Sequence, residues 1–175
     1  EYLLEMKKSG VVRHIGLSSH TPELAQIILD TGLVDQLMFS INPAYDYHHG
    51  EFAFGSARER MDLYRRCEAE GIGISVMKPY SGGQMLDGRT SPFGKALSKV
   101  QCLQYALDKP GVVTVLPGVR NLEDVKEALA WLDASQQERD YSVLGTFTPK
   151  DAAGSCVYCS HCHPCPAGLN IGLIN

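Results

Sequence analysis

The sequence lacks a surplus of positive charge and lacks any long run of apolar residues. Sixteen Lys and Arg stand against twenty Asp and Glu, which gives a formal net charge of -4. Nucleic-acid binders normally carry a basic face, and polybasic segments are typical of proteins at membrane surfaces. No apolar run approaches the roughly 18 residues of a membrane-spanning helix. We therefore expect neither a nucleic-acid partner nor a membrane partner.

The first residues, EYLLE, lack the basic-then-apolar pattern of a secretory signal peptide. The hydrophobic fraction of 44% and the charged fraction of 21% are near globular averages, so disorder of the whole chain is excluded. A length of 175 residues predicts about one domain. We expect a cytoplasmic globular protein whose sequence starts like the middle of a longer one.

Strands and helices alternate along the first 132 residues. Short apolar runs predict strands at residues 11–18, 37–41, 72–77 and 112–116. One helix is predicted to begin with Thr21 as its N-cap and Pro22 at its first position. Further helices are predicted over residues 56–70, 96–107 and 122–131. The polar and aromatic segment 44–55 is expected to be a loop. Because strands that alternate with helices form parallel sheets, the fold class is α/β, with nearly apolar strands covered on both faces.

Two of these helices carry apolar side chains at helical spacing, which predicts a face packed on the core. The predicted core residues are Leu24, Ile27, Ile28 and Leu29 in the first helix and Leu122, Val125, Leu129 and Leu132 in the last. In the helix 56–70 the corresponding stripe is Met61, Tyr64 and Cys67, flanked by Leu63 and interrupted by arginines.

Three ordered motifs resemble the aldo-keto reductase family. Residues 10–20, GVVRHIGLSSH, resemble its fifth strand, and residues 115–125, VLPGVRNLEDV, resemble its eighth strand and the following helix. The sequence VMKP at 76–79, followed by Gly82 and Gly83, resembles the seventh strand of a subgroup with a C-terminal iron–sulfur segment. The resemblance implies strands five to eight, the back half, of a (β/α)8 barrel. The family's catalytic residues lie on its first four units, so no catalytic residue is assigned in this chain.

The resemblance also implies a nicotinamide dinucleotide, NAD(P), at the carboxyl ends of the strands. Ser18 matches a serine that binds the nicotinamide carboxamide, and Ser19 stands where asparagine is usual. Lys78 falls near a tyrosine that stacks on the nicotinamide; a cation cannot stack in the same way and would instead place positive charge near a flavin, a phosphate or an acidic substrate. Gly118 stands in place of a lysine that binds the 2′-phosphate, and Arg120 is a substitute cation. Two further departures are Met38, where glutamine is common, and Asp124, where the family has a phosphate-binding arginine.

Residue types alone leave other interpretations open for these positions. Serines at a strand end are equally typical of turns and caps, and Lys78 or Arg120 also fits a solvated surface cation. His48, His49 and Glu51 suggest a metal site, although a polar surface loop fits them better. Tyr45 and Tyr47 suit either a substrate mouth or packing of their loop.

The six cysteines are unevenly placed, and four of them form a C-x2-C-x2-C-x2-C-P run. These are Cys156, Cys159, Cys162 and Cys165, whereas Cys67 and Cys102 stand on apolar helix faces as small hydrophobes. Thiolates at this spacing resemble the ligands of a 4Fe-4S cluster in bacterial ferredoxins, with the last gap one residue shorter. Zinc is the alternative, since His161 and His163 lie within the run, although structural zinc usually takes two separated pairs. A disulfide framework is disfavoured because the chain builds its own core.

The sequence therefore predicts a reductase half-barrel at residues 1–132, a linker at 133–154 and the start of a ferredoxin-like extension at 155–175. The expected partners are a small carbonyl substrate and a redox partner protein. The alternative is a half-barrel module for electron transfer or zinc binding, whose open edges favour homo-oligomers.

Overall fold

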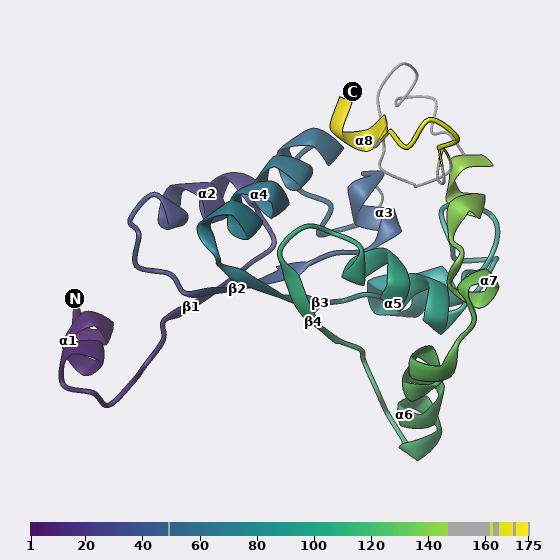
Figure 1. The fold of residues 1–175 in the computed structure, drawn as a ribbon. Coiled ribbons are helices and arrows are strands. Elements are labelled where there is room, and N and C mark those ends of the chain that lie inside the picture. Colours follow the sequence, from purple (N-terminus) through teal and green to yellow (C-terminus); the bar gives the residue numbers. More distant parts are fainter. Residues whose placement is uncertain (49, 147–161, 163–164, 170, 175) are drawn as a thin grey trace.

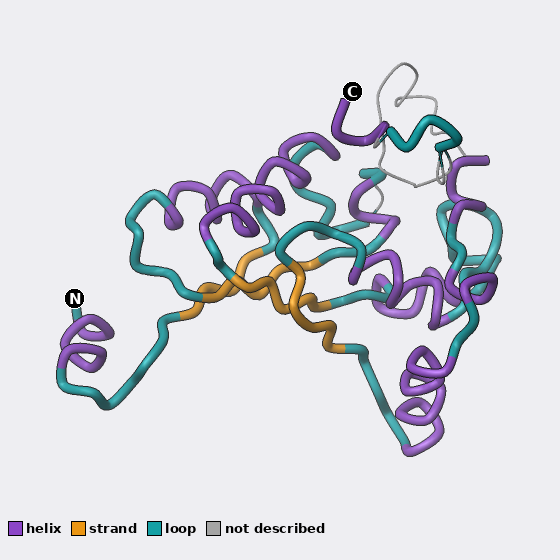
Figure 2. Tube along the Cα trace, in the orientation of Figure 1, coloured by secondary structure: helices purple, strands orange, loops and turns teal. Residues whose placement is uncertain are grey.

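The computed structural model describes all residues except 49, 147–161, 163–164, 170 and 175. Its centre is one sheet of four parallel strands that neighbour each other in chain order (Figures 1 and 2). The strands are β1 (Gly16–Ser19), β2 (Gln36–Ser40), β3 (Gly73–Met77) and β4 (Val112–Leu116). The predicted α/β class and parallel sheet are thus confirmed, and three strands lie within one residue of their predicted bounds.

The strand predicted at 11–18 begins only at Gly16, so this prediction was wrong over its first half. A short helix that the sequence analysis did not predict, α1 (Tyr2–Lys8), precedes it. The amides of Val11 and Val12 both donate to the carbonyl of Met6, at 2.9 and 3.2 Å. Because these donors close the end of α1, they are not available to a strand ladder.

Helices follow each strand and carry recognisable end signals. Ser56 and Ser98 form capping boxes with Glu59 and Gln101, and Gly71 ends its helix at φ +71°, which glycine adopts without strain. The α-helices are α2 (Pro22–Leu29), α3 (Pro43–Asp46), α4 (Ala57–Glu70), α5 (Lys99–Leu107), α6 (Leu122–Leu129), α7 (Gln136–Arg139) and α8 (Ile171–Ile174). The 3-10 turns are η1 (Ser81–Leu86), η2 (Ala130–Asp133) and η3 (Ser142–Thr146). Among the described residues, no helix combines the length and the apolar character that crossing a membrane requires.

The core lies between the sheet and the helices on one of its faces, where α2 and α4 lie side by side (Figure 1). Leu37 and Phe39 of β2 and Ile74 and Val76 of β3 alternate toward this face and are fully buried. The predicted stripe of α4 is confirmed, since Met61, Leu63, Tyr64 and Cys67 are all buried.

The opposite face of the sheet carries several polar side chains and is partly exposed in the described chain, so the expectation of apolar strands covered on both faces was wrong. The register aligns Ser18 with Met38, Met38 with Ser75, and Ser75 with Thr114. Ser18 and Thr114 are exposed, and Gln36 donates to Ser75 across the strands at 2.5 Å. Because strand side chains alternate, this row faces away from the helices, with Ser75 buried in its middle.

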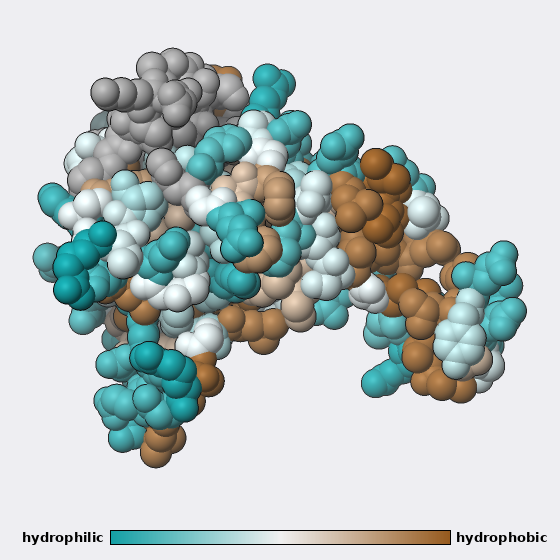
Figure 3. Space-filling view, turned by 180° about the vertical axis from the view of Figure 1, so that it is seen from behind, coloured by the Kyte–Doolittle hydropathy of each residue, from teal (hydrophilic) through white to brown (hydrophobic). Residues whose placement is uncertain are grey.

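The apolar faces predicted for α2 and α6 are largely exposed. In α2, Ala25 and Leu29 are buried, whereas Leu24 and Ile27 are 49% and 58% exposed. Figure 3 shows apolar side chains gathered over α1 and α2, at the β1 edge of the sheet. Val113 and Leu116 of β4 are exposed, as are Leu122, Leu129 and Leu132 of α6 and the turn that follows it. The described part of the chain has no strand beyond either edge for these side chains to pack on.

Two segments expected to lack regular structure are partly ordered. The loop at 44–55 contains part of α3, and Tyr45 and Tyr47 are both 4% exposed. Within the predicted linker, residues 133–146 run along α5, where Tyr141 donates to Asp108 at 2.8 Å and Leu144 is fully buried. Both segments therefore add side chains to the core.

Candidate functional site

The carboxyl ends of the four strands meet at one edge of the sheet, as parallel strands must. This is the edge at which barrels and open α/β sheets bind ligands. The residues at this edge are Ser18 and Ser19 at the end of β1, His20 after it, Asn42 after β2, Lys78 and Tyr80 after β3, and Gly118 and Arg120 after β4. We take this edge as the candidate site.

The two serines at the end of the first strand differ in their surroundings. Ser19 is buried, and its hydroxyl donates to the Thr21 carbonyl at 3.2 Å and accepts from the Thr21 amide at 3.1 Å. This is a local turn that leads the chain into α2. Ser18 is exposed on the polar face of the sheet and is thus the serine accessible to a ligand.

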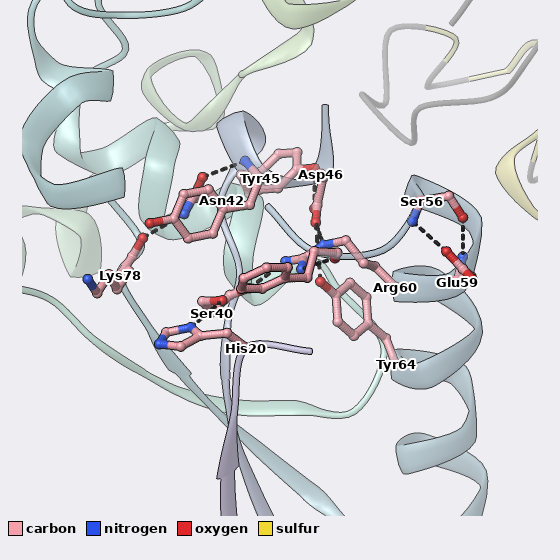
Figure 4. A network of polar contacts seen from close by, with 12 residues as sticks. His20, Ser40, Asn42, Tyr45, Asp46, Ser56, Glu59, Arg60, Tyr64 and Lys78 are labelled. Atoms are coloured by element: carbon pink, nitrogen blue, oxygen red, sulfur yellow. Dashed lines mark hydrogen bonds and ion pairs between the residues drawn. The ribbon is translucent and has the colours of Figure 1, made fainter. Parts of the chain in front are cut away.

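His20 links the first two strand ends (Figure 4). Its Nδ1 lies 3.0 Å from the Ser40 hydroxyl, and its ring stacks on Phe52 with centroids 4.6 Å apart. Burial lowers the pKa of His20, and the nearby charges of Lys78 and Arg60 lower it further. The ring is therefore neutral at pH 7, with one nitrogen donating and the other accepting.

Asn42 joins the second strand end to the third (Figure 4). Its side chain is fully buried; the Oδ1 accepts from the Tyr45 amide and the Nδ2 donates to the Lys78 carbonyl, both at 2.9 Å. Lys78 itself is exposed, and its Nζ lies 4.3 Å from the centre of the Phe52 ring. His20, Phe52 and Lys78 thus form one group, which we call the strand-end cluster.

A buried ion pair lies beneath this cluster and was not predicted. Arg60 of α4 is fully buried and donates through Nε to Asp46 at 2.6 Å; it also donates to the Ser40 carbonyl. The hydroxyls of Tyr64 and Tyr105 donate to the same carboxylate, at 3.2 and 2.6 Å. The signal in the sequence is the i, i+4 spacing of Arg60 and Tyr64, which places the arginine on the buried face of α4.

The end of the fourth strand carries a different charge arrangement. Arg120 is 86% exposed, yet both its amide and its Nε donate to one oxygen of Asp124, at 3.0 and 3.1 Å. Lys99 of α5 donates to the other oxygen at 2.7 Å. Gly118 is open, since an added Cβ meets nothing within 4 Å. The single carboxylate of Asp124 therefore holds both cations on this side of the edge.

We expect Asp124→Asn to flatten the acid limb of the stability profile. Hydrogen bonds from Lys99 and then Arg120 hold the pKa of Asp124 well below its ordinary value of 3.8. A depressed carboxyl contributes stability that is present above the unfolded pKa and is lost as pH falls through the folded one. Thermal melts of the full-length protein from about pH 6 to about pH 3 should show a smaller fall of Tm in the variant. Glu123→Gln, at an exposed neighbouring carboxylate, is the control that should keep the wild-type profile.

The predicted site residues therefore lie in three regions: the ends of β1 and β3, the end of β4, and the cysteine-rich tail. Ser18 and Lys78 lie at the ends of β1 and β3, and Arg120 lies beside Gly118 at the end of β4. Of the four tail cysteines, Cys156 and Cys159 lie outside the described residues; Cys162 is exposed and Cys165 is half-buried. Among the residues that the structure describes, no three His, Cys, Asp or Glu side chains gather to hold a metal ion. His48 is exposed, and His49 is not described.

Three residues of types that can act in catalysis, Tyr80, Cys67 and Cys102, sit in packing positions. Tyr80 is 6% exposed, and burial raises the pKa of its hydroxyl to about 12. Burial likewise raises the pKa values of Cys67 and Cys102, to about 11 and about 12. Since the thiolate is the reactive and metal-binding form, neither of these cysteines suits a nucleophile or a ligand.

Comparison with known proteins gives a consistent result. The model of the aldo/keto reductase family matches residues 1–99. The aldo-keto reductase AKR11C1 from Bacillus halodurans is similar in structure, with a TM-score of 0.61 for its holo form at 18% identity, over 82% of this chain and 52% of its own. Its apo form gives 0.60 at 19%, over 82% and 53%.

The thermostable aldo-keto reductase Tm1743, in complex with the inhibitor epalrestat, gives a TM-score of 0.54 at 18% identity, over 83% of this chain and 52% of its own. Among curated proteins, none matches this chain significantly. The chain thus spans about half the length of the solved structures it matches, and these similarities concern the fold.

Proposed function

Because the chain belongs to the aldo/keto reductase family, we propose that it supplies the second half of a (β/α)8 barrel that reduces a carbonyl compound with NAD(P)H. The observation that carries the proposal is the edge at which four parallel strands end together with exposed polar and cationic side chains. The two apolar edges, at β1 and β4, fit contact with the other half of such a barrel. No residue of this chain is assigned to proton transfer.

The residues at the edge fit a nicotinamide dinucleotide. The reduced nicotinamide supplies the hydride when it is bound, and the protein binds and orients it. We assign Ser18 to the carboxamide because it is exposed at the end of β1, while Ser19 shapes the turn behind it. Arg120 and the open backbone at Gly118 are assigned to the phosphate and ribose part. Because Asp124 already pairs with Arg120, it lowers the affinity of this cation for the 2′-phosphate that distinguishes NADP from NAD.

Carbonyl-dependent oxidation of NADH or NADPH by the full-length protein tests this function. We expect turnover of simple aromatic aldehydes and binding of at least one reduced dinucleotide. Ser18→Ala should weaken dinucleotide binding several-fold, since it removes a hydrogen bond of about 1 kcal/mol. Ser9→Ala, at an exposed serine beyond α1, is the matched control. A full-length protein that binds neither dinucleotide and reduces no carbonyl contradicts the proposal.

We also propose that Cys156, Cys159, Cys162 and Cys165 hold a 4Fe-4S cluster that passes electrons to a redox partner protein. The chemistry of the donors supports this, because the other two cysteines are buried with raised pKa values and are poor thiolate ligands. The ligand set then lies within the run itself. Zinc at the same thiolates is the competing assignment.

The exposed apolar side chains at both sheet edges favour a second candidate, a non-catalytic half-barrel module that self-associates. Sedimentation of the protein purified from its source cells distinguishes the two. A species near 19.2 kDa per chain that pairs with itself and lacks reductase activity supports the module. A longer chain with activity supports the reductase.

A further inference from the structure

Lys78 is a cation with no carboxylate partner among the described residues. Other cations around the candidate site are neutralised: Arg60 pairs with Asp46 at 2.6 Å, and Lys99 pairs with Asp124 at 2.7 Å. The Lys78 amine lies over the face of Phe52, which orients it but carries no charge. The positive charge at the end of β3 therefore remains available to a ligand.

The backbone holds Lys78 in an uncommon conformation. Its φ is +58°, in the left-handed region, and the residue precedes Pro79, which normally favours extended backbone. The carbonyl of Lys78 accepts two hydrogen bonds, from Asn42 Nδ2 at 2.9 Å and from the Ser81 amide at 3.0 Å. These two hydrogen bonds hold the backbone of Lys78 in its strained conformation, and strained residues of this kind cluster at functional sites.

The neighbours of the Lys78 amine suit an oxyanion. His20 is neutral and lies against the same Phe52 ring, and only its Nδ1 is hydrogen-bonded among the described residues. The Nε2 can then form a further hydrogen bond, on a ring that contacts the same Phe52 side chain as the Lys78 amine. Both side chains project from strand ends at the same edge of the sheet as Ser18, the residue assigned to the nicotinamide (Figure 4 for His20 and Lys78).

We propose that Lys78 and His20 form a subsite for an oxyanion group of the substrate, so that the enzyme selects carbonyl compounds that also carry a carboxylate or phosphate. This inference rests on the proposed reductase function and names its substrate class. Arg120, at the other end of the edge, is the cation assigned to the nucleotide, which leaves Lys78 for the substrate.

The test compares phenylglyoxylate with its methyl ester, which have the same ketone and differ in charge. In the full-length protein we expect kcat/KM to favour the acid, and Lys78→Met to lower the acid-to-ester ratio at least tenfold, as loss of a charge-assisted hydrogen bond of about 1.5–3 kcal/mol implies. Lys78→Arg should keep most of the ratio. Lys126→Met, which removes an exposed lysine of α6, should not change it.

Calorimetric binding of phenylglyoxylate to the wild type and to Lys78→Met tests the subsite without turnover. Binding that depends on Lys78 in a protein without reductase activity contradicts the proposed function and retains the subsite. The subsite is overturned if the wild type does not prefer the acid, or if Lys78→Met lowers kcat/KM equally for the acid and the ester. It is also overturned if the variant weakens NADH or NADPH binding and leaves the acid-to-ester ratio of kcat/KM unchanged. Lys78 would then bind a phosphate of the cofactor and not the substrate.

Discussion

Replacing Arg60 with methionine is expected to lower the free energy of unfolding by about 3–5 kcal/mol, because it leaves a buried carboxylate without its cation. Arg60 is fully buried on α4 and bonds Asp46 at 2.6 Å. Methionine has a similar volume, so the loss reports the ion pair rather than a cavity. Urea unfolding of the full-length protein measures this change in the free energy of unfolding, taken from the transition in which the described sheet unfolds.

Arg58→Met is the matched control for this prediction. It removes the same charge from the same helix, but Arg58 is 87% exposed and lies 3.9 Å from Asp62. Exposed pairs of this kind contribute about 0–1 kcal/mol. A double variant, Arg60→Met with Asp46→Asn, should recover part of the loss, because no unpaired charge is then buried and the amide oxygen still accepts from a tyrosine hydroxyl. Equal effects of Arg58→Met and Arg60→Met would show that the buried pair does not stabilise the fold.

The same network should matter for the candidate site. Arg60 donates to the carbonyl of Ser40, whose hydroxyl contacts His20, and Asp46 belongs to the helix that Asn42 caps. Asn42 in turn holds the carbonyl of Lys78. The charge pair is therefore a positioning element beneath the strand-end cluster, and its loss should loosen that cluster together with the fold.

Serine at Cys159 is expected to abolish iron binding by the full-length protein. Serine oxygen replaces thiolate poorly in iron–sulfur clusters, whose ligands are cysteine thiolates. Anaerobic purification with assay of iron and acid-labile sulfide measures the result. The wild type should contain both in equal amounts, and the variant should contain neither.

Cys67→Ala is the control for the cysteine experiment. Cys67 is buried on α4, and burial raises the pKa of its thiol to about 11. We expect its removal to leave the iron content unchanged, at a cost in stability of the kind caused by a small cavity. Cys165→Ser then asks whether the fourth ligand lies within the run. Zinc without sulfide in the wild type would overturn the cluster assignment.

The sequence predicted local structure well where the cause is local. Short apolar runs predicted the bounds of β2, β3 and β4 to within one residue. Ser56, Gly71 and Pro22 marked helix ends through caps and backbone preference. Val11 and Val12 have strand propensity as well, yet they close the end of α1, because hydrogen bonds to Met6 take their amides.

The candidate site was predicted only in part. The order of the motifs gave the family and the edge at which the strands end, and it drew attention to Ser18 and Lys78. It did not reveal that Phe52 and Asn42, distant from both in the sequence, hold the Lys78 side chain and carbonyl. Neither residue belongs to a motif, since their contribution is a position in space.

The sequence by itself determined the α/β class, the family and the cysteine run, because periodicity, caps and ligand spacing are properties of neighbouring residues. Only the tertiary structure decided the fate of individual side chains. Leu24 and Leu122 lie on apolar stripes, but they are exposed because no described element packs over them. Arg60 is charged, but it is buried because a carboxylate and two tyrosines from separate elements surround it. Burial depends on what packs against a residue, and long-range contacts alone settle that.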